Sequence, residues 1–251
     1  MKATSELHST FRDLRFRAIP DVYSSIKKQA ENEGLSYDEF LLRLLKAETE
    51  QKRVRKIMGL LRRARLPHGK TLSSFEEERV PLSVRRKLRG LLDGGFLERK
   101  ENLLVFGKPG SGKTHLVCAV AHELIQKGHS ILFTTAQMLV QDLLMAKRDL
   151  FLKKQIRKLA GYDAVIVDDI GYVQQSREEM EVLFTLLAER YETGSLMLTS
   201  NLPFSKWEQI FKDPMTTAAA IDRLVHHSLI IELNVQSYRM DAAKSRKSGQ
   251  E

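Results

Sequence analysis

The sequence predicts an α/β fold, in which a parallel sheet of five strands is covered by helices on both faces and preceded by a small all-helical domain. Three observations predict this fold. From residue 102 onward, short apolar runs alternate with helix-length segments, a pattern typical of a parallel sheet buried on both sides. The first of these runs leads directly into a glycine-rich loop. The first hundred residues instead show the 3.6-residue spacing of helices.

The all-helical region is expected to contain two main helices. Pro20 can begin the first and Gly34 can end it. Ser36 and Glu39 form a capping box, in which each side chain can bond the backbone N–H of the other residue. A second, longer helix should therefore follow and run to about Arg65. The chain ahead of Pro20 has no clear period and fits either an arm or a short first helix.

The remaining elements alternate along the chain. After a connector, a helix is expected over residues 81–92. Strands are expected at 103–106, 130–134, 164–168, 196–200 and 229–233. Helices are expected at 113–128, over 136–160 as a pair meeting near residue 149, and at 178–191, 205–211 and 215–227.

A phosphate-binding loop lies between the first strand and the helix that follows it. Residues 107–114 carry the complete G-x-x-x-x-G-K-[ST] pattern in its required context. The glycines let backbone N–H groups point at phosphate oxygens, and the helix N-terminus adds partial positive charge. Lys113 is placed to reach the β and γ phosphates, and Thr114 to bind Mg²⁺. The predicted nucleotide-binding residues are Gly107, Lys108, Pro109, Gly110, Ser111, Gly112, Lys113 and Thr114.

The excess of basic residues lies entirely in the first hundred residues. These carry 23 Lys and Arg against 14 Asp and Glu, whereas residues 101–251 carry 18 of each. Such asymmetry indicates a polyanion or an acidic partner, and a solvated basic helix face is the alternative. The second half of the long helix has seven basic residues with no acid between them, so it suits DNA phosphates or an acidic protein surface. Its DNA-binding candidates are Arg53, Arg55, Lys56, Arg62 and Arg63.

Composition favours a cytosolic protein. No apolar run approaches the ~20 residues of a membrane-spanning helix, and the N-terminal residues lack the apolar core of a signal peptide. The one cysteine, Cys118, cannot form an internal disulfide and is expected to be a small core residue.

Polar residues at strand ends indicate ATP hydrolysis. Asp168 and Asp169 follow an apolar strand, and ligands of parallel sheets sit at the carboxyl ends of the strands. Asp168 is then expected to hold the Mg²⁺ shell and Asp169 to orient the attacking water. Asn201 ends another strand and can bond the water or the γ-phosphate. Arg223 and Arg239 are candidates for the positive charge that phosphoryl transfer needs, with a surface salt bridge as the alternative for each.

These motifs in combination resemble the IstB family, the AAA+ helper ATPases of insertion-sequence transposition, which are akin to the helicase loader DnaC. The resemblance covers about residues 20–240 and rests on the phosphate loop and on five further segments, 133–136, 162–172, 199–204, 221–228 and 237–239. It implies an AAA+ P-loop NTPase, which binds ATP and Mg²⁺, forms homo-oligomers through ATP-bridged interfaces, deforms double-stranded DNA with weak sequence preference, and stimulates a transposase.

The resemblance also implies roles for single residues. Arg223 matches the arginine finger that acts on the neighbouring subunit's ATP, Arg239 the second sensor and Asn201 the first. The helix pair over 136–160 lies where this clade carries a DNA-facing helix. Its DNA-contact candidates, for which a solvated face is the alternative, are Lys147, Arg148, Lys153 and Lys154. The expected domains are a helical N-terminal domain over 1–66, a helical connector over 67–101, an AAA+ ATPase domain over 102–240 and a disordered basic tail over 241–251.

One departure from the family pattern leaves other functions open. The family usually has Glu where this chain has Asp169, whose side chain is one methylene shorter. A catalytic group misplaced by ~1 Å can cost ~100-fold in rate, so hydrolysis is expected to be slow. A DNA scaffold that uses ATP only for assembly is therefore an alternative, and a DnaC-like replicative helicase loader is another.

Overall fold

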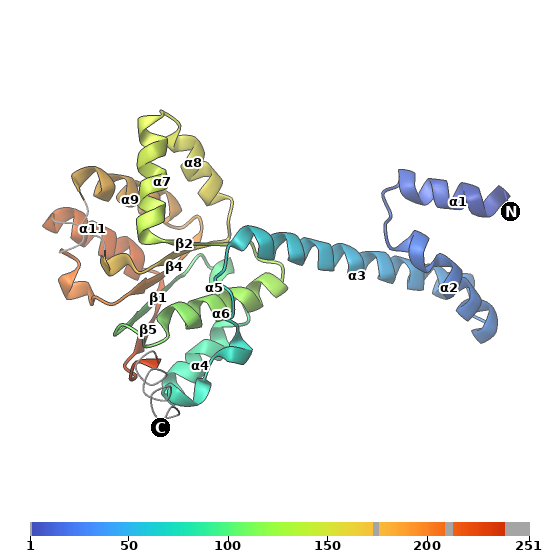
Figure 1. The fold of residues 1–251 in the computed structure, drawn as a ribbon, viewed down its shortest axis with the longest axis horizontal. Coiled ribbons are helices and arrows are strands. Elements are labelled where there is room, and N and C mark those ends of the chain that lie inside the picture. Colours follow the sequence, from blue (N-terminus) through green and yellow to red (C-terminus); the bar gives the residue numbers. More distant parts are fainter. Residues whose placement is uncertain (1, 173–175, 209–212, 239–251) are drawn as a thin grey trace, which may run out of the picture. The chain divides into compact units, whose positions relative to one another are not determined.

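A computed structural model describes residues 2–172, 176–208 and 213–238 of the chain (Figure 1). Its contacts divide the chain into two compact units, residues 1–59 and 60–251, which are described separately. The domain boundaries drawn from the sequence stay predictions. The expected tail over 241–251 and Arg239 lie outside the described residues.

The N-terminal unit is helical, as predicted. It contains α1 (Lys2–Asp13), α2 (Ile19–Glu33) and the larger part of α3 (Tyr37–Ala64). The first residues, for which either an arm or a short helix was expected, form the helix α1. Gly34 ends α2 in a left-handed conformation with φ of 64°. The predicted capping box is present, because the Ser36 N–H donates to Glu39 Oε2 at 2.9 Å and the Glu39 N–H donates to Ser36 Oγ at 3.3 Å.

A buried carboxylate ties α2 to α3 within this unit. The Glu48 side chain is 3% exposed, and its Oε2 accepts from the backbone N–H groups of Arg17 at 2.8 Å and Ala18 at 2.7 Å. The N–H of Ile19 follows at 3.3 Å. These groups are the unpaired donors at the start of α2, so Glu48 caps that helix from a distance in sequence. Burial opposes ionisation of Glu48, but the backbone donors outweigh burial and lower its pKa.

The second unit contains a parallel sheet with the strand order β2-β3-β4-β1-β5 (Figure 1). In chain order the strands are β1 (Asn102–Gly107), β2 (Ile131–Thr135), β3 (Ala164–Asp168), β4 (Ser195–Ser200) and β5 (Ser228–Leu233). The predicted fold class and each predicted strand are confirmed. No helix among the described residues is long and apolar enough to cross a membrane.

Helices cover both faces of the sheet. One face packs against α4 (Leu82–Leu91), α5 (Gly95–Glu98) and α6 (Lys113–Gln126). The other packs against α7 (Ala136–Arg148), α8 (Leu152–Ala160), α9 (Arg177–Arg190) and α11 (Pro214–Val225). The predicted helix pair over 136–160 is thus confirmed. At 205–211 the structure has a short 3₁₀ turn, η4 (Phe204–Lys206), and residues 209–212 lie outside the described residues.

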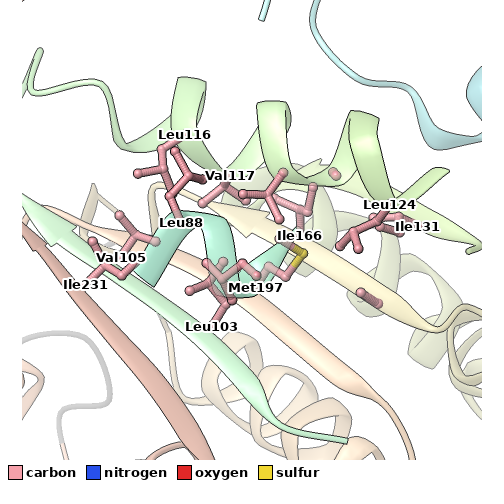
Figure 2. Packing of buried hydrophobic residues seen from close by; sticks show 14 of the residues in the cluster. Leu88, Leu103, Val105, Leu116, Val117, Leu124, Ile131, Ile166, Met197 and Ile231 are labelled. Carbon is pink, nitrogen blue, oxygen red and sulfur yellow. The ribbon is translucent and has the colours of Figure 1, made fainter. Parts of the chain in front are cut away.

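Alternation along the strands assigns side chains to the two faces. Leu103 and Val105 of β1 belong to the α6 side of the core, whereas Leu104 between them belongs to the α7 side. Figure 2 shows Leu116 and Val117 of α6 lying over the first of these sets. All of these side chains are fully buried, so the sheet holds the carboxyl ends of its strands, where the polar residues gather, in fixed positions.

Candidate nucleotide-binding site

The predicted phosphate loop connects β1 to α6 and requires glycine at several positions. Gly110 and Gly112 have φ of 79° and 90°, a region that side chains disfavour. A Cβ on Gly107 would lie 2.6 Å from the Leu233 carbonyl oxygen, and one on Gly110 would lie 2.1 Å from Ser237 Oγ. A side chain at these positions would therefore strain the loop backbone or clash with its neighbours.

Lys113 and Ser111 lie inside this loop. The Lys113 side chain is buried, and its Nζ donates to the carbonyls of Gly107 at 2.9 Å and Lys108 at 3.1 Å. Ser111 Oγ is also buried and finds no hydrogen-bond partner among the described residues. An unpaired buried hydroxyl costs about 1–3 kcal/mol. A phosphate oxygen would satisfy the Ser111 hydroxyl, and the Lys113 ammonium lies in the same loop, so both residues fit a bound triphosphate.

The two residues predicted to bind Mg²⁺, Thr114 and Asp168, contact each other directly. Thr114 Oγ1 donates to Asp168 Oδ1 at 2.9 Å and lies 3.0 Å from Oδ2. A hydroxyl and a carboxylate are the hard oxygen ligands that Mg²⁺ prefers, with phosphate and water oxygens completing its shell. The residues present therefore fit the cation that the sequence predicts.

Thr199 belongs to this cluster, although sequence analysis did not find it. Its fully buried hydroxyl donates to Asp168 Oδ1 at 2.6 Å and accepts from the backbone N–H of Asp169 at 2.8 Å. One side chain thus fixes the carboxylate of Asp168 and the main chain of the next residue. The signal is the register of β3 with β4, where Val167 pairs with Leu198 and so brings Thr199 beside Asp168. That register is not visible in the sequence.

Asp169 stands in a left-handed backbone conformation with φ of 59°. Asp and Asn tolerate this region better than longer side chains do. The backbone therefore gives a physical reason for Asp, and not the longer Glu, at this position. Asp169 lines the same cavity as the phosphate loop, so the structure brings the two together as predicted.

The cavity beside the loop has a volume of about 260 Å³. One side of it is lined by the aromatic rings of Phe75, His115 and Tyr238, and is called the ring-lined side below. Phe75 and His115 lie edge to face with ring centroids 5.3 Å apart. Tyr238, near the C-terminal end of the sequence, also lines this cavity. Its N–H donates to the Gly110 carbonyl at 3.0 Å, and the Arg79 guanidinium stacks on its ring at 4.0 Å. Sequence analysis did not identify this ring-lined side, because it joins residues more than 160 positions apart.

The two sensor candidates have different outcomes. Asn201 follows the carboxyl end of β4, and its buried Oδ1 finds no partner among the described residues. It lines a neighbouring cavity of about 320 Å³ with Gly107 and Lys108, next to the loop and separate from the ring-lined cavity. Arg239 lies outside the described residues, so its role stays a prediction.

Arg223 lies far from the phosphate loop of its own chain. It is half-buried on α11, donates to the Ala219 carbonyl at 3.2 Å and stacks on Phe184 at 4.8 Å. It lines a small pocket with Lys100 and Asn102, at the amino ends of the strands. Thr114 and Asp168 stand at the carboxyl ends, so Arg223 and the phosphate loop lie at opposite ends of the sheet.

The predicted DNA-binding residues divide into paired and unpaired cations. Arg53 bonds Glu50 at 2.8 Å, Arg55 bonds Glu48 at 3.2 Å and Lys147 bonds Glu181 at 2.9 Å. The others are exposed and have no acidic partner among the described residues: Lys56, Arg62, Arg63, Arg148, Lys153 and Lys154. Arg62 and Arg63 also line a groove of about 410 Å³ with Arg65 and Lys158.

Comparison with known proteins decides the family. The profile of the IstB-like ATP binding protein family matches residues 9–247 of the chain. The chain belongs to this family. An insertion-sequence ATP-binding protein of Sinorhizobium fredii is 41% identical over 94% of this chain and 79% of its own length. The IS21 ATP-binding protein of Pseudomonas aeruginosa is 36% identical over 97% and 91%. This IstB-like chain thus matches insertion-sequence ATP-binding proteins over nearly its whole length.

Solved structures support the fold of the IstB-like chain. The DnaC helicase loader superposes with a TM-score of 0.57 at 16% identity, over 66% of this chain and 98% of DnaC. AMPPCP-bound DnaA of Aquifex aeolicus superposes with a TM-score of 0.56 at 17% identity, over 74% of this chain and 56% of DnaA. At such identities the likeness concerns the fold alone.

Proposed function

We propose that this IstB-like protein hydrolyses ATP as a helper of insertion-sequence transposition, which assembles on target DNA, deforms it and stimulates a transposase. The observation that carries hydrolysis is the cluster in which Thr114 and Thr199 both donate to Asp168 while Asp169 lines the nucleotide cavity. Asp168 would serve the metal in binding and in hydrolysis alike, so Asp169, which follows β3 and lines the cavity, is the acid that supports hydrolysis. A cytoplasmic location follows from the use of ATP and DNA.

Each residue of the cluster has a defined task in this proposal. The phosphate loop and Lys113 bind the β and γ phosphates. Thr114 and Asp168 hold Mg²⁺, which neutralises charge on the phosphates when bound. Asp169 orients the attacking water, and Asn201 bonds that water or the γ-phosphate. The rings of Phe75 and Tyr238 provide apolar faces on which adenine can stack.

Oligomerisation completes the site. Arg223 sits at the opposite end of the sheet from the phosphate loop, so it can reach a γ-phosphate only on a neighbouring subunit. An arginine supplied in this way is typically worth 10³–10⁵ in rate. We therefore propose that ATP bridges adjacent subunits and that assembly and hydrolysis depend on one another.

The test is the assembly state on duplex DNA. Electron microscopy and sedimentation of the full chain with magnesium should show rings or helical arrays with a non-hydrolysable ATP analogue and smaller species without it. Shortened DNA in the assemblies would support deformation, and a purified cognate transposase should gain activity. A protein that stayed monomeric on DNA under both conditions would overturn the proposal.

A non-hydrolysing DNA scaffold is the second candidate, and Asp169 favours it. The short side chain in a left-handed backbone position reaches less far than Glu would. The scaffold predicts ATP-dependent filaments with no phosphate release, whereas the helper ATPase predicts release that DNA accelerates. A colorimetric phosphate assay with and without DNA separates the two. A DnaC-like helicase loader remains an alternative that stimulation of a replicative helicase would reveal.

A further inference from the structure

The turn between α7 and α8 projects an apolar residue into solvent. Leu150 is 94% exposed and has φ of 61°. The turn is fixed by two backbone bonds, from the Leu150 N–H to the Lys147 carbonyl at 3.2 Å and from the Phe151 N–H to the Ala146 carbonyl at 2.9 Å. This is the Schellman arrangement, in which the left-handed position is usually glycine. The tip of the turn is therefore rigid, and its apolar side chain is held outward.

Leucine is an unfavourable choice at this position for folding. A non-glycine residue in the left-handed region costs roughly 1–2 kcal/mol, and a fully exposed side chain gains no burial in return. The other non-glycine residues with positive φ in the described chain are all polar: Arg15, Arg65, Lys100, Asp169 and Glu192. Phe151 and Met145 beside the tip are also exposed, at 43% and 60%. The chain thus presents an apolar point where stability favours glycine.

Cations outnumber acids around this apolar point, and Asp149 directly precedes Leu150 in sequence. Residues 136–160 contain six Lys and Arg against two Asp. Arg148, Lys153 and Lys154 flank the tip and have no acidic partner among the described residues. The apolar residues Ile156 and Leu159 of α8 are buried in the core. The tip therefore lacks the long apolar face by which helices bind a lipid surface, and its charge complements a polyanion.

From this geometry we propose that Leu150, with Phe151 behind it, is a wedge that enters duplex DNA between adjacent base pairs and kinks it. Side chains of this kind unstack base steps from the minor groove in DNA-bending proteins. Arg148, Lys153 and Lys154 would hold the phosphates on either side of the inserted residue. The inference rests on the DNA binding of the proposed function and names the residue that deforms the DNA.

Two substitutions at the tip separate the wedge from folding. Leu150→Gly and Leu150→Asn suit the left-handed backbone, so the melting temperature should stay equal or rise. The unchanged protein and each variant should then be compared in the presence of ATP and a duplex labelled at both ends. Energy transfer measures the shortening of the DNA, and binding titration measures the affinity. We expect the unchanged protein to shorten the end-to-end distance of the DNA, and both variants to lose this effect while affinity falls by less than about tenfold. Met138→Ala, which removes an exposed apolar residue at the other end of α7, should bend DNA normally.

The outcomes are distinct. Loss of bending in both tip variants, with bending kept in Met138→Ala, supports the wedge. Normal bending by the tip variants overturns it, and if those variants at the same time fail to stimulate a transposase, the tip is a protein contact instead. If the unchanged protein binds no DNA at all, the proposed function fails first, and that result is visible before any variant is made.

Discussion

The nucleotide end of the sheet and the α7–α8 turn both carry groups suited to phosphate, but they are built in opposite ways. At the nucleotide end, Lys113 and Asp168 are buried and held by neighbouring hydrogen bonds. At the turn, Lys153 and Lys154 are exposed and have no acidic partner among the described residues. The first arrangement suits a small ligand that is held by geometry, and the second suits a long polyanion that is attracted by charge.

This contrast predicts where mutations and salt should act. Buried, bonded groups work in a low effective dielectric, so each contributes strongly and salt screens it little. Exposed cations contribute little singly, and counterions compete with them. We therefore expect large, salt-insensitive effects at the sheet and small, salt-sensitive effects at the turn.

The largest effect is expected at Arg223. Arg223→Ala should keep ATP binding and lose about 1,000-fold of the DNA-stimulated hydrolysis rate, because a finger arginine acts on transition-state charge. Nucleotide titration and steady-state phosphate release measure the two quantities. Retained stimulation in this variant would break the assignment to the subunit interface.

Lys113→Ala should weaken ATP binding at least about 100-fold, since it removes the buried ammonium that faces the phosphates. Calorimetric titration measures this, with Lys127→Ala at the other end of α6 as the matched control. If the loss of ATP affinity in Lys113→Ala became much smaller at high salt, the expectation that buried cations are insensitive to salt would be wrong.

Glu48 tests whether the rule for buried charges extends to the N-terminal unit. Glu48→Gln should destabilise that unit by about 2 kcal/mol, because three backbone donors lose a charged acceptor. The lowered pKa of Glu48 also means that its stabilisation is complete above the ordinary value of 4.5 and is lost as pH falls through the folded-state pKa. Thermal unfolding followed by circular dichroism should therefore show that the unchanged protein loses helix at a lower temperature in acid than at neutral pH. This pH dependence should be weaker in Glu48→Gln.

Asp169→Glu should raise the ATPase rate by about tenfold, because the longer side chain reaches further toward the water. The same change should lower thermal stability slightly, since Glu fits the left-handed position less well than Asp. Rate and melting temperature are measured together. An unchanged or lower rate with DNA present would remove the idea that reach limits turnover.

The smallest effect is expected from the double change Lys153→Gln and Lys154→Gln. DNA affinity should fall by about fivefold and the slope of log affinity against log salt by about 1.8, the value for two phosphate contacts. Fluorescence anisotropy across a salt series measures both, with Lys27→Gln and Lys28→Gln on α2 as the matched control. An unchanged slope would place the DNA contacts elsewhere.

Local patterns predicted most of the fold but only part of the site. The phosphate loop, the Ser36–Glu39 capping box and the strand ending at Asp168 each depend on residues close together in sequence, and the structure contains all three. Thr199, by contrast, reaches Asp168 only through strand register. Phe75 and Tyr238 line one cavity although most of the chain separates them in sequence. Such contacts depend on how elements pack, which no short pattern records.

The contact between Gly110 and Tyr238 links two distant parts of the polypeptide. A main-chain bond joins the apex of the glycine turn to the residue that immediately precedes Arg239 in sequence. A change in the backbone at that apex on triphosphate binding would move or break this hydrogen bond. Tyr238 is therefore a position at which nucleotide occupancy can be sensed beyond the loop itself.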